Sequence, residues 1–120
     1  MKYYRLKQGL LQDDIATLTG TEVSTIKRYE NNQHELALDI CNKIAHAIGI
    51  DPELIYDNYL KFLSNNFGSE IKMFRKNNKL SQAKFGSLLG VHRKTIIRWE
   101  KEREFPSREN FKKLELIIPN

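Results

Sequence analysis

The chain has 120 residues and a mass of 14.1 kDa, which is room for one ordinary domain or two very small ones. Its hydrophobic content of 40% is sufficient for a core, so disorder of the whole chain is excluded. It has no apolar run of transmembrane length, no apolar secretory segment after Met1, and one cysteine, Cys41, which excludes an internal disulfide. We therefore expect a cytoplasmic protein.

Positive charge is concentrated in the second half of the chain. Residues 1–67 hold 7 basic and 9 acidic side chains, whereas residues 68–120 hold 13 basic and 6 acidic ones. The whole chain has a formal net charge of +5 and a pI near 9.4. This asymmetry is typical of a second half that faces a polyanion, although a solvated lysine-rich surface has the same composition.

The chain contains an internal repeat. A shift of 70 residues brings many identical residues into register without a gap. The identical pairs include Lys2/Lys72, Arg5/Arg75, Leu10/Leu80, Gln12/Gln82, Gly20/Gly90, Thr25/Thr95, Ile26/Ile96, Arg28/Arg98 and Glu30/Glu100. We interpret the sequence as two copies of one module.

Each copy is predicted to consist of short helices. Apolar residues recur at three- and four-residue spacing and no segment alternates over the length of a strand, so the fold class is all-α. Gly20 and Gly90 mark left-handed turns, and Asp51 before Pro52 and Ser107 after Pro106 are expected helix caps. The predicted helices are 2–8, 12–19, 22–30, 37–48, 52–63, 69–78, 82–89, 92–102 and 107–117.

These elements divide the chain into a first domain over 1–63, a linker over 64–69 in which Ser69 caps the next helix, and a second domain over 70–120. The fifth helix, 52–63, has no counterpart in the second copy. It is too apolar for the edge of one small domain, so we expect it to pack between the domains or to form a homodimer interface.

A helix, a glycine turn and a second helix form a helix-turn-helix arrangement. The first copy shows it in Gln12–Ala16, Gly20 and Ser24–Glu30, and the second in Leu80–Gln82, Gly90 and Lys94–Glu100. These motifs resemble the phage repressor/Cro (XRE-like) family, twice and over nearly the whole chain. The resemblance implies two tandem repressor-like helix-turn-helix domains joined by a linker helix, with recognition helices at 22–30 and 92–102. It also implies buried ion pairs of Arg5 with Glu30 and of Arg75 with Glu100.

The implied partner is double-stranded DNA, with no cofactor. The base-contact candidates are His92, Arg93, Lys94, Ile97 and Arg98 in the second copy and Val23, Ser24, Lys27 and Arg28 in the first. The phosphate-contact candidates are Gln12, Gln82, Lys79, Lys84, Lys101 and Arg103. Glu22 repels phosphate, so the second copy is expected to bind DNA more strongly.

The expected function is sequence-specific regulation of transcription, of the repressor type. No phosphate-binding loop, nucleophile elbow or metalloprotease motif is present in the sequence, and His34, His46 and His92 lack partners at metal-ligand spacing, so we expect no enzyme and no metal. One alternative is an antitoxin-like or adaptor protein that binds a protein partner through its first domain. Another is non-specific coating of the nucleoid.

Overall fold

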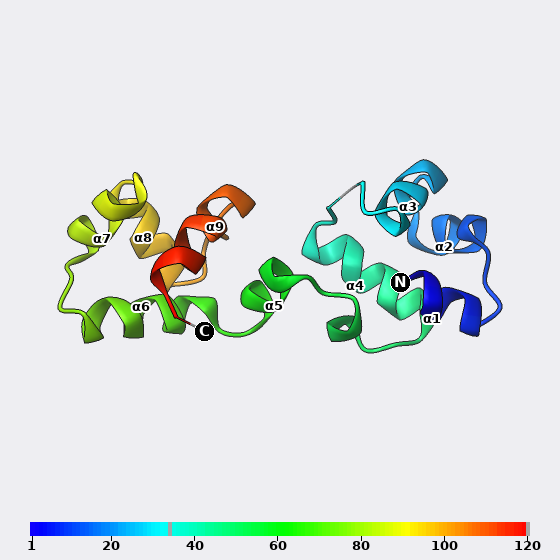
Figure 1. Cartoon of the computed structure of the whole chain (residues 1–120), viewed down its shortest axis with the longest axis horizontal. Coiled ribbons are helices and arrows are strands. Elements are labelled where there is room, and N and C mark those ends of the chain that lie inside the picture. Colours follow the sequence, from blue (N-terminus) through cyan, green and yellow to red (C-terminus); the bar gives the residue numbers. More distant parts are fainter. Residues whose placement is uncertain (34, 120) are drawn as a thin grey trace. The chain divides into compact units, whose positions relative to one another are not determined.

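The computed structural model describes residues 1–33 and 35–119, and every regular element in these ranges is a helix. His34 and Asn120 lie outside the described residues. The contacts within the chain divide it into unit 1, Met1–Leu60, and unit 2, Lys61–Asn120. Figure 1 shows that each unit is a small helical body. The all-α prediction is confirmed.

Unit 1 is built around a core in which the Ile15, Ile26 and Ile44 side chains are fully buried. Its second and third helices meet at Gly20, which adopts the left-handed conformation predicted for it, with φ 68°. Cys41 lies in the same core. The elements are α1 (Lys2–Lys7), α2 (Gln12–Thr19), α3 (Val23–Glu30), α4 (Leu38–Ile48), a 3-10 helix, η1 (Pro52–Leu54), and the beginning of α5 (Asn58–Ser64).

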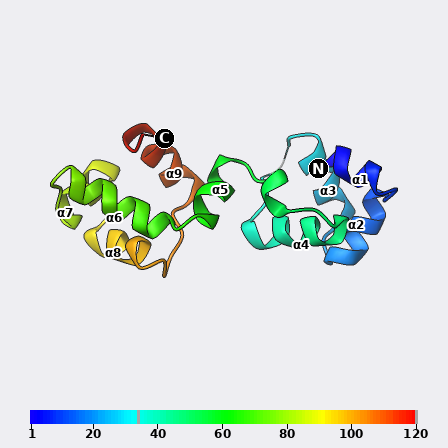
Figure 2. The same ribbon diagram turned by 90° about the horizontal axis from the view of Figure 1, so that it is seen from below.

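Unit 2 repeats this arrangement around Phe85, Ile96 and Trp99, all of them buried. Its α8 packs against both α6 and α7 (Figure 2). The α9 helix packs against α7. The Ser107 side chain caps α9 by accepting the Asn110 backbone N–H, as predicted. After the end of α5, the elements are α6 (Phe67–Asn77), α7 (Gln82–Leu89), α8 (Arg93–Glu100) and α9 (Arg108–Ile117).

The prediction of one helix over 52–63 is wrong. Asp51 caps the first turn as expected, by accepting the Glu53 backbone N–H. The helix is then interrupted because the Ile55 carbonyl accepts a hydrogen bond from the Tyr29 hydroxyl. The Asp57 side chain accepts the Leu60 N–H at 2.8 Å and so starts a new helix, α5.

The prediction of a linker over 64–69, with Ser69 as the helix cap, is also wrong. The N-cap is Asn66 and α6 begins at Phe67. Phe67 is 1% exposed, and its ring centroid lies 5.8 Å from that of Phe62 and 5.7 Å from that of Phe105. Burial of this aromatic side chain favours the extra helical turn.

The residues of α5 contribute to both units. Leu60 belongs to the core of unit 1, whereas the Phe62 ring packs against Phe67 and Phe111 in unit 2. The predicted homodimer contact of this helix stays a prediction. Within the described ranges, none of the helices combines the length and the apolar character that crossing a bilayer requires.

Candidate nucleic-acid interface

The helix-turn-helix motif of unit 2 is formed by α7, the turn Gly90–His92 and α8. Gly90 has φ 72°, a conformation that glycine adopts without strain. The turn also passes very close to α7, because a Cβ built on Gly86 would lie 2.6 Å from the Val91 carbonyl oxygen. Unit 1 has Ala16 at the equivalent position. These small residues allow the two helices of each motif to approach closely.

The α8 helix has one buried and one exposed face. Ile96 and Trp99 point into the core and fix the orientation of the helix. The predicted base-contact side chains His92, Arg93, Lys94 and Arg98 are exposed, and Ile97 is half-buried. The structure thus places these five residues together at the surface.

Two of these side chains have partners within unit 2. His92 caps α8 by accepting the Lys94 backbone N–H on its Nδ1 atom at 3.1 Å. The Arg98 guanidinium lies 3.6 Å from the Glu104 carboxylate, and both side chains are about half exposed. An exposed ion pair of this kind is weak, so Arg98 can leave Glu104 for another partner at little cost in free energy.

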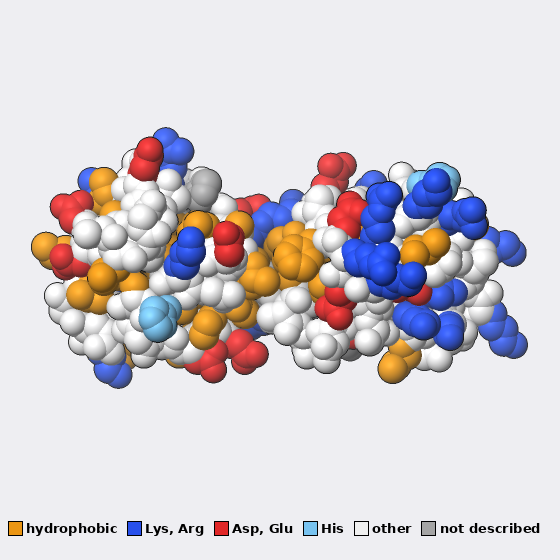
Figure 3. Space-filling view, turned by 180° about the vertical axis from the view of Figure 1, so that it is seen from behind, with side chains coloured by type: hydrophobic (Ala, Val, Ile, Leu, Met, Phe, Trp, Pro, Cys, Tyr) orange, Lys and Arg blue, Asp and Glu red, His pale blue; other side chains and the backbone are white. Residues whose placement is uncertain are grey.

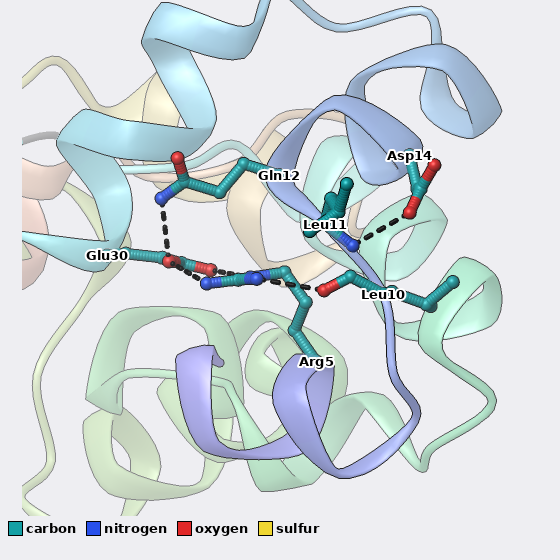
Figure 4. A network of polar contacts seen from close by, with 6 residues as sticks. All are labelled: Arg5, Leu10, Leu11, Gln12, Asp14 and Glu30. Carbon is teal, nitrogen blue, oxygen red and sulfur yellow. Dashed lines mark hydrogen bonds and ion pairs between the residues drawn. The ribbon is translucent and has the colours of Figure 1, made fainter.

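A buried polar network supports the motif in both units. In unit 1, Arg5 donates two hydrogen bonds to the Glu30 carboxylate, at 2.7 and 2.9 Å, and a third to the Leu10 carbonyl (Figure 4). In unit 2, Arg75 makes the same three contacts with Glu100 and the Leu80 carbonyl. Both ion pairs tie the first helix of a unit to the end of its recognition helix.

The glutamines predicted to contact phosphate extend these networks. Gln12 donates to Glu30 at 3.0 Å, and Gln82 donates to Glu100 at 3.4 Å. Hydrogen bonding to Glu30 raises the pKa of Arg5. Burial alone would raise the pKa of Glu30, but the hydrogen bonds from Arg5 and Gln12 outweigh it and hold that pKa below its usual value. In unit 1 the network therefore keeps both charges on the ion pair.

Unit 2 has a cationic cavity next to the start of α7. It has a volume of about 440 Å³, and its lining includes Lys72 and Lys76 from α6, Lys101 after α8, and Ser81 and Gln82. Free backbone N–H groups and positive charge at a helix start favour a phosphate group. Lys72 and Lys76 were not among the phosphate-contact candidates predicted from the sequence. Their spacing of four residues, which places both on one side of a helix, was the available signal.

The other phosphate-contact candidates of unit 2 do not line this cavity. Lys79 lies in the turn between α6 and α7 with φ 55°, and Arg103 lies in the segment between α8 and α9. Lys84 lies in the first turn of α7, where its backbone N–H is capped by Ser81. All three side chains are exposed.

The equivalent surface of unit 1 has a different chemistry. The cavity at the start of α2 is lined by Leu11 and Asp13 as well as by Lys2, Arg5 and Lys27. The Asp14 carboxylate accepts the Leu11 backbone N–H at 2.7 Å, so it occupies one of the donors that a phosphate would need (Figure 4). Leu6 and Leu11, at the positions of Lys76 and Ser81, are 56% and 66% exposed. This surface therefore carries less positive charge than its counterpart in unit 2.

The recognition helix of unit 1, α3, carries its candidates in the same places as α8. Ser24, Lys27 and Arg28 are exposed and Val23 is half-buried. Glu22 is also exposed at the start of the helix, where unit 2 has His92. Figure 3 shows the consequence for charge: Lys and Arg gather over unit 2, on the right of that view, whereas the face of unit 1 is mixed.

Within the described residues, His, Cys, Asp and Glu side chains form no group of three that could hold a metal ion.

Comparison with known proteins agrees with this geometry. A search of curated proteins found no match, and neither did a search of solved structures. A helix-turn-helix family model matches residues 1–55 and again residues 71–118. The chain therefore belongs to the DNA-binding, repressor/Cro-like helix-turn-helix family, and it contains two copies of the family's domain.

Proposed function

We propose that the protein is a sequence-specific regulator of transcription, of the repressor type, that reads double-stranded DNA mainly with α8. The observation that carries this proposal is the combination of a rigidly packed α8 with an exposed cationic face. Ile96 and Trp99 hold the buried side, and Arg93, Lys94 and Arg98 occupy the exposed side. A helix held in this way suits the major groove.

Specificity is assigned to the exposed side chains of α8. His92, Arg93 and Lys94 lie at the helix start, the part of a recognition helix that typically contacts base edges. Arg98 can donate two hydrogen bonds to guanine O6 and N7, an interaction worth about 1–3 kcal/mol of discrimination. Ile97 offers an apolar contact for a thymine methyl group.

The cationic cavity of unit 2 is assigned to the DNA backbone. Lys72, Lys76 and Lys101 surround the start of α7, where a phosphate group gains both charge and backbone N–H donors. Lys79, Lys84 and Arg103 add positive charge around it. These contacts fix the register of α8 in the groove, and they make the affinity depend on salt concentration.

Unit 1 is assigned a smaller share of DNA binding. Val23, Ser24, Lys27 and Arg28 are its remaining base-contact candidates, and Asp14 opposes phosphate at α2. The exposed Leu6 and Leu11 support a second candidate function, in which unit 1 holds a protein partner while unit 2 binds DNA.

The test is selection of bound sequences from random duplex DNA, followed by titrations at two salt concentrations. The Arg98→Ala variant is expected to lose about 1–3 kcal/mol of binding free energy and its preference at one base position. The Arg28→Ala variant is expected to change the selected motif little. Lys112→Ala, on the exposed side of α9, is the charge-matched control. Failure to enrich any sequence would overturn the proposal. Loss of the selected motif with Arg28→Ala alone would mean that α3 of unit 1, and not α8, contacts the bases.

A further inference from the structure

The residue that precedes the recognition helix differs between the two units in its hydrogen-bonding chemistry. Unit 2 has His92 at this place, and unit 1 has Glu22, 70 positions earlier. Each is the N-cap of its helix, with an extended backbone, and each side chain is exposed. This end of a recognition helix typically contacts base edges, so the chemistry of the N-cap side chain bears on which bases a unit selects.

The cap of α8 determines which nitrogen of the His92 ring carries the proton. The Nδ1 atom accepts the Lys94 backbone N–H at 3.1 Å. A ring nitrogen that accepts a hydrogen bond is unprotonated, and a neutral imidazole carries its single proton on the other nitrogen. The proton of the neutral His92 ring therefore lies on Nε2. Because the two ring nitrogens point in different directions, Nε2 is turned away from the Lys94 amide and presents an N–H donor.

The Glu22 side chain has the opposite chemistry in unit 1. Within residues 1–33, it makes no capping hydrogen bond to α3. Its Oε2 atom lies 3.5 Å from the Ser24 hydroxyl, which donates to it. Carboxylate oxygens accept hydrogen bonds and do not donate them. The N-cap side chain of unit 2 thus offers a donor to the surroundings, whereas that of unit 1 offers acceptors.

We propose that His92 is a specificity-determining residue, which selects guanine over cytosine at one position of the DNA segment that unit 2 reads. This inference rests on the proposed function and deepens it. In the major groove guanine offers the N7 and O6 acceptors, whereas cytosine offers the N4 donor. The Nε2–H group matches the guanine acceptors, and the capping bond of Nδ1 keeps the ring from presenting an acceptor to cytosine instead. A carboxylate at this place, such as that of Glu22, would favour cytosine.

The first test examines the ring without DNA. NMR spectra that correlate the carbon-bound ring protons with the ring nitrogens identify the protonated nitrogen of each histidine in the full chain. They are recorded at a pH at which imidazole is neutral, and the signals of His92 are those that His92→Ser removes. The expected result is a proton on Nε2. A proton mainly on Nδ1 would overturn the proposal, because that nitrogen could not then accept the Lys94 amide.

The second test is selection from random duplex DNA with the native protein and variants of His92. His92→Ser keeps a capping oxygen but ends well short of the place of Nε2. It is expected to lower the preference for guanine over cytosine about three- to tenfold, the range of one neutral hydrogen bond. His92→Asn has both a capping oxygen and an N–H donor, so it should retain part of the preference. His92→Glu gives unit 2 the residue of unit 1 and should reverse the preference toward cytosine.

The control for folding is the urea midpoint of unit 2, read from the fluorescence of Trp99, which should be similar in the native and His92→Ser proteins. A selected motif that stays unchanged in His92→Ser and His92→Glu would overturn this inference and leave the proposed function intact. A loss of affinity without any change of base preference would mean that His92 contacts phosphate, and would also overturn it. Failure of the native protein to enrich any sequence would overturn both.

Discussion

Units 1 and 2 have the same buried polar network beneath different surfaces. In both, an arginine from the first helix binds a glutamate at the end of the recognition helix, and a glutamine joins them. Above this network, unit 2 carries Lys76, Ser81 and Lys84, whereas unit 1 carries Leu6, Leu11 and Asp14. The buried network is thus common to both units, and the exposed positions are where we propose that they differ in DNA binding. Exposed positions can change in this way because they contribute little to stability.

The largest expected effect comes from breaking one network. Glu100→Ala leaves the Arg75 charge buried and unpaired, which is expected to cost about 3–5 kcal/mol of unit 2 stability. Trp99 is the single tryptophan, so its fluorescence in urea reports unit 2. Glu30→Ala should damage unit 1 and leave the Trp99 transition in place, and Glu109→Ala on α9 is the control. Equal shifts of the Trp99 transition by both variants would show that the units unfold together.

The next effect concerns the helix crossing, where the units differ by one methyl group. Gly86→Ala is expected to destabilise unit 2 by about 1–3 kcal/mol, because the added Cβ meets the Val91 carbonyl oxygen at 2.6 Å. Ala16→Gly should cost unit 1 about 1 kcal/mol through helix propensity alone. Urea unfolding measures both. A stabilised Gly86→Ala variant would show that the turn relaxes easily.

An exchange of surface residues tests the DNA side of the comparison. The double variant Lys76→Leu, Lys84→Asp gives unit 2 the residues of unit 1 at these positions. It is expected to lower the affinity for DNA roughly tenfold. The slope of the logarithm of the binding constant against the logarithm of salt concentration is expected to fall by about two. The reciprocal Leu6→Lys with Asp14→Lys gives unit 1 the residues of unit 2. Titrations of a selected duplex measure both pairs. Unchanged affinity and salt slope in the first pair would remove the cationic cavity from the interface.

The smallest effect is a difference in alkaline stability. Burial raises the pKa of Tyr29 from 10.0 to about 12, so folding favours the neutral phenol. The resulting stabilisation is fully present below pH 10 and is lost as the pH rises from 10 to 12. Trp99, its counterpart in unit 2, does not titrate. Tyr29→Phe should remove part of the loss of unit 1 stability at alkaline pH, whereas Tyr3→Phe should not. The NMR signals of unit 1, recorded in urea, measure this loss. The same loss in the native protein and in both variants would refute this assignment.

Much of the fold could be predicted because local sequence and tertiary packing agree. The glycine turns, the Ser107 cap and the buried Ile26 and Ile96 depend on residue type and spacing alone, and the repeat doubles each signal. The resemblance to the repressor/Cro family implied the pair of Arg5 and Glu30, which lie 25 residues apart in the sequence.

The errors arose where tertiary contacts override local signals. The Tyr29 hydroxyl binds the Ile55 carbonyl and interrupts a helix that Asp51 starts well, and packing of Phe67 extends α6 into a stretch with the composition of a linker. The cationic cavity was missed in part for a related reason. Lys72 and Lys101 meet only when α6 and α8 are placed side by side.

The seven-residue helix α5 has a consequence for any attempt to separate the two units. Leu60 belongs to one core and Phe62 to the other, with a single residue between them. A fragment that ends at Leu60 would place a core residue at a frayed terminus, and a fragment that begins at Lys61 would lack the turn that Asp57 starts. Each excised half is therefore expected to resist proteolysis less well than the same half does in the intact chain.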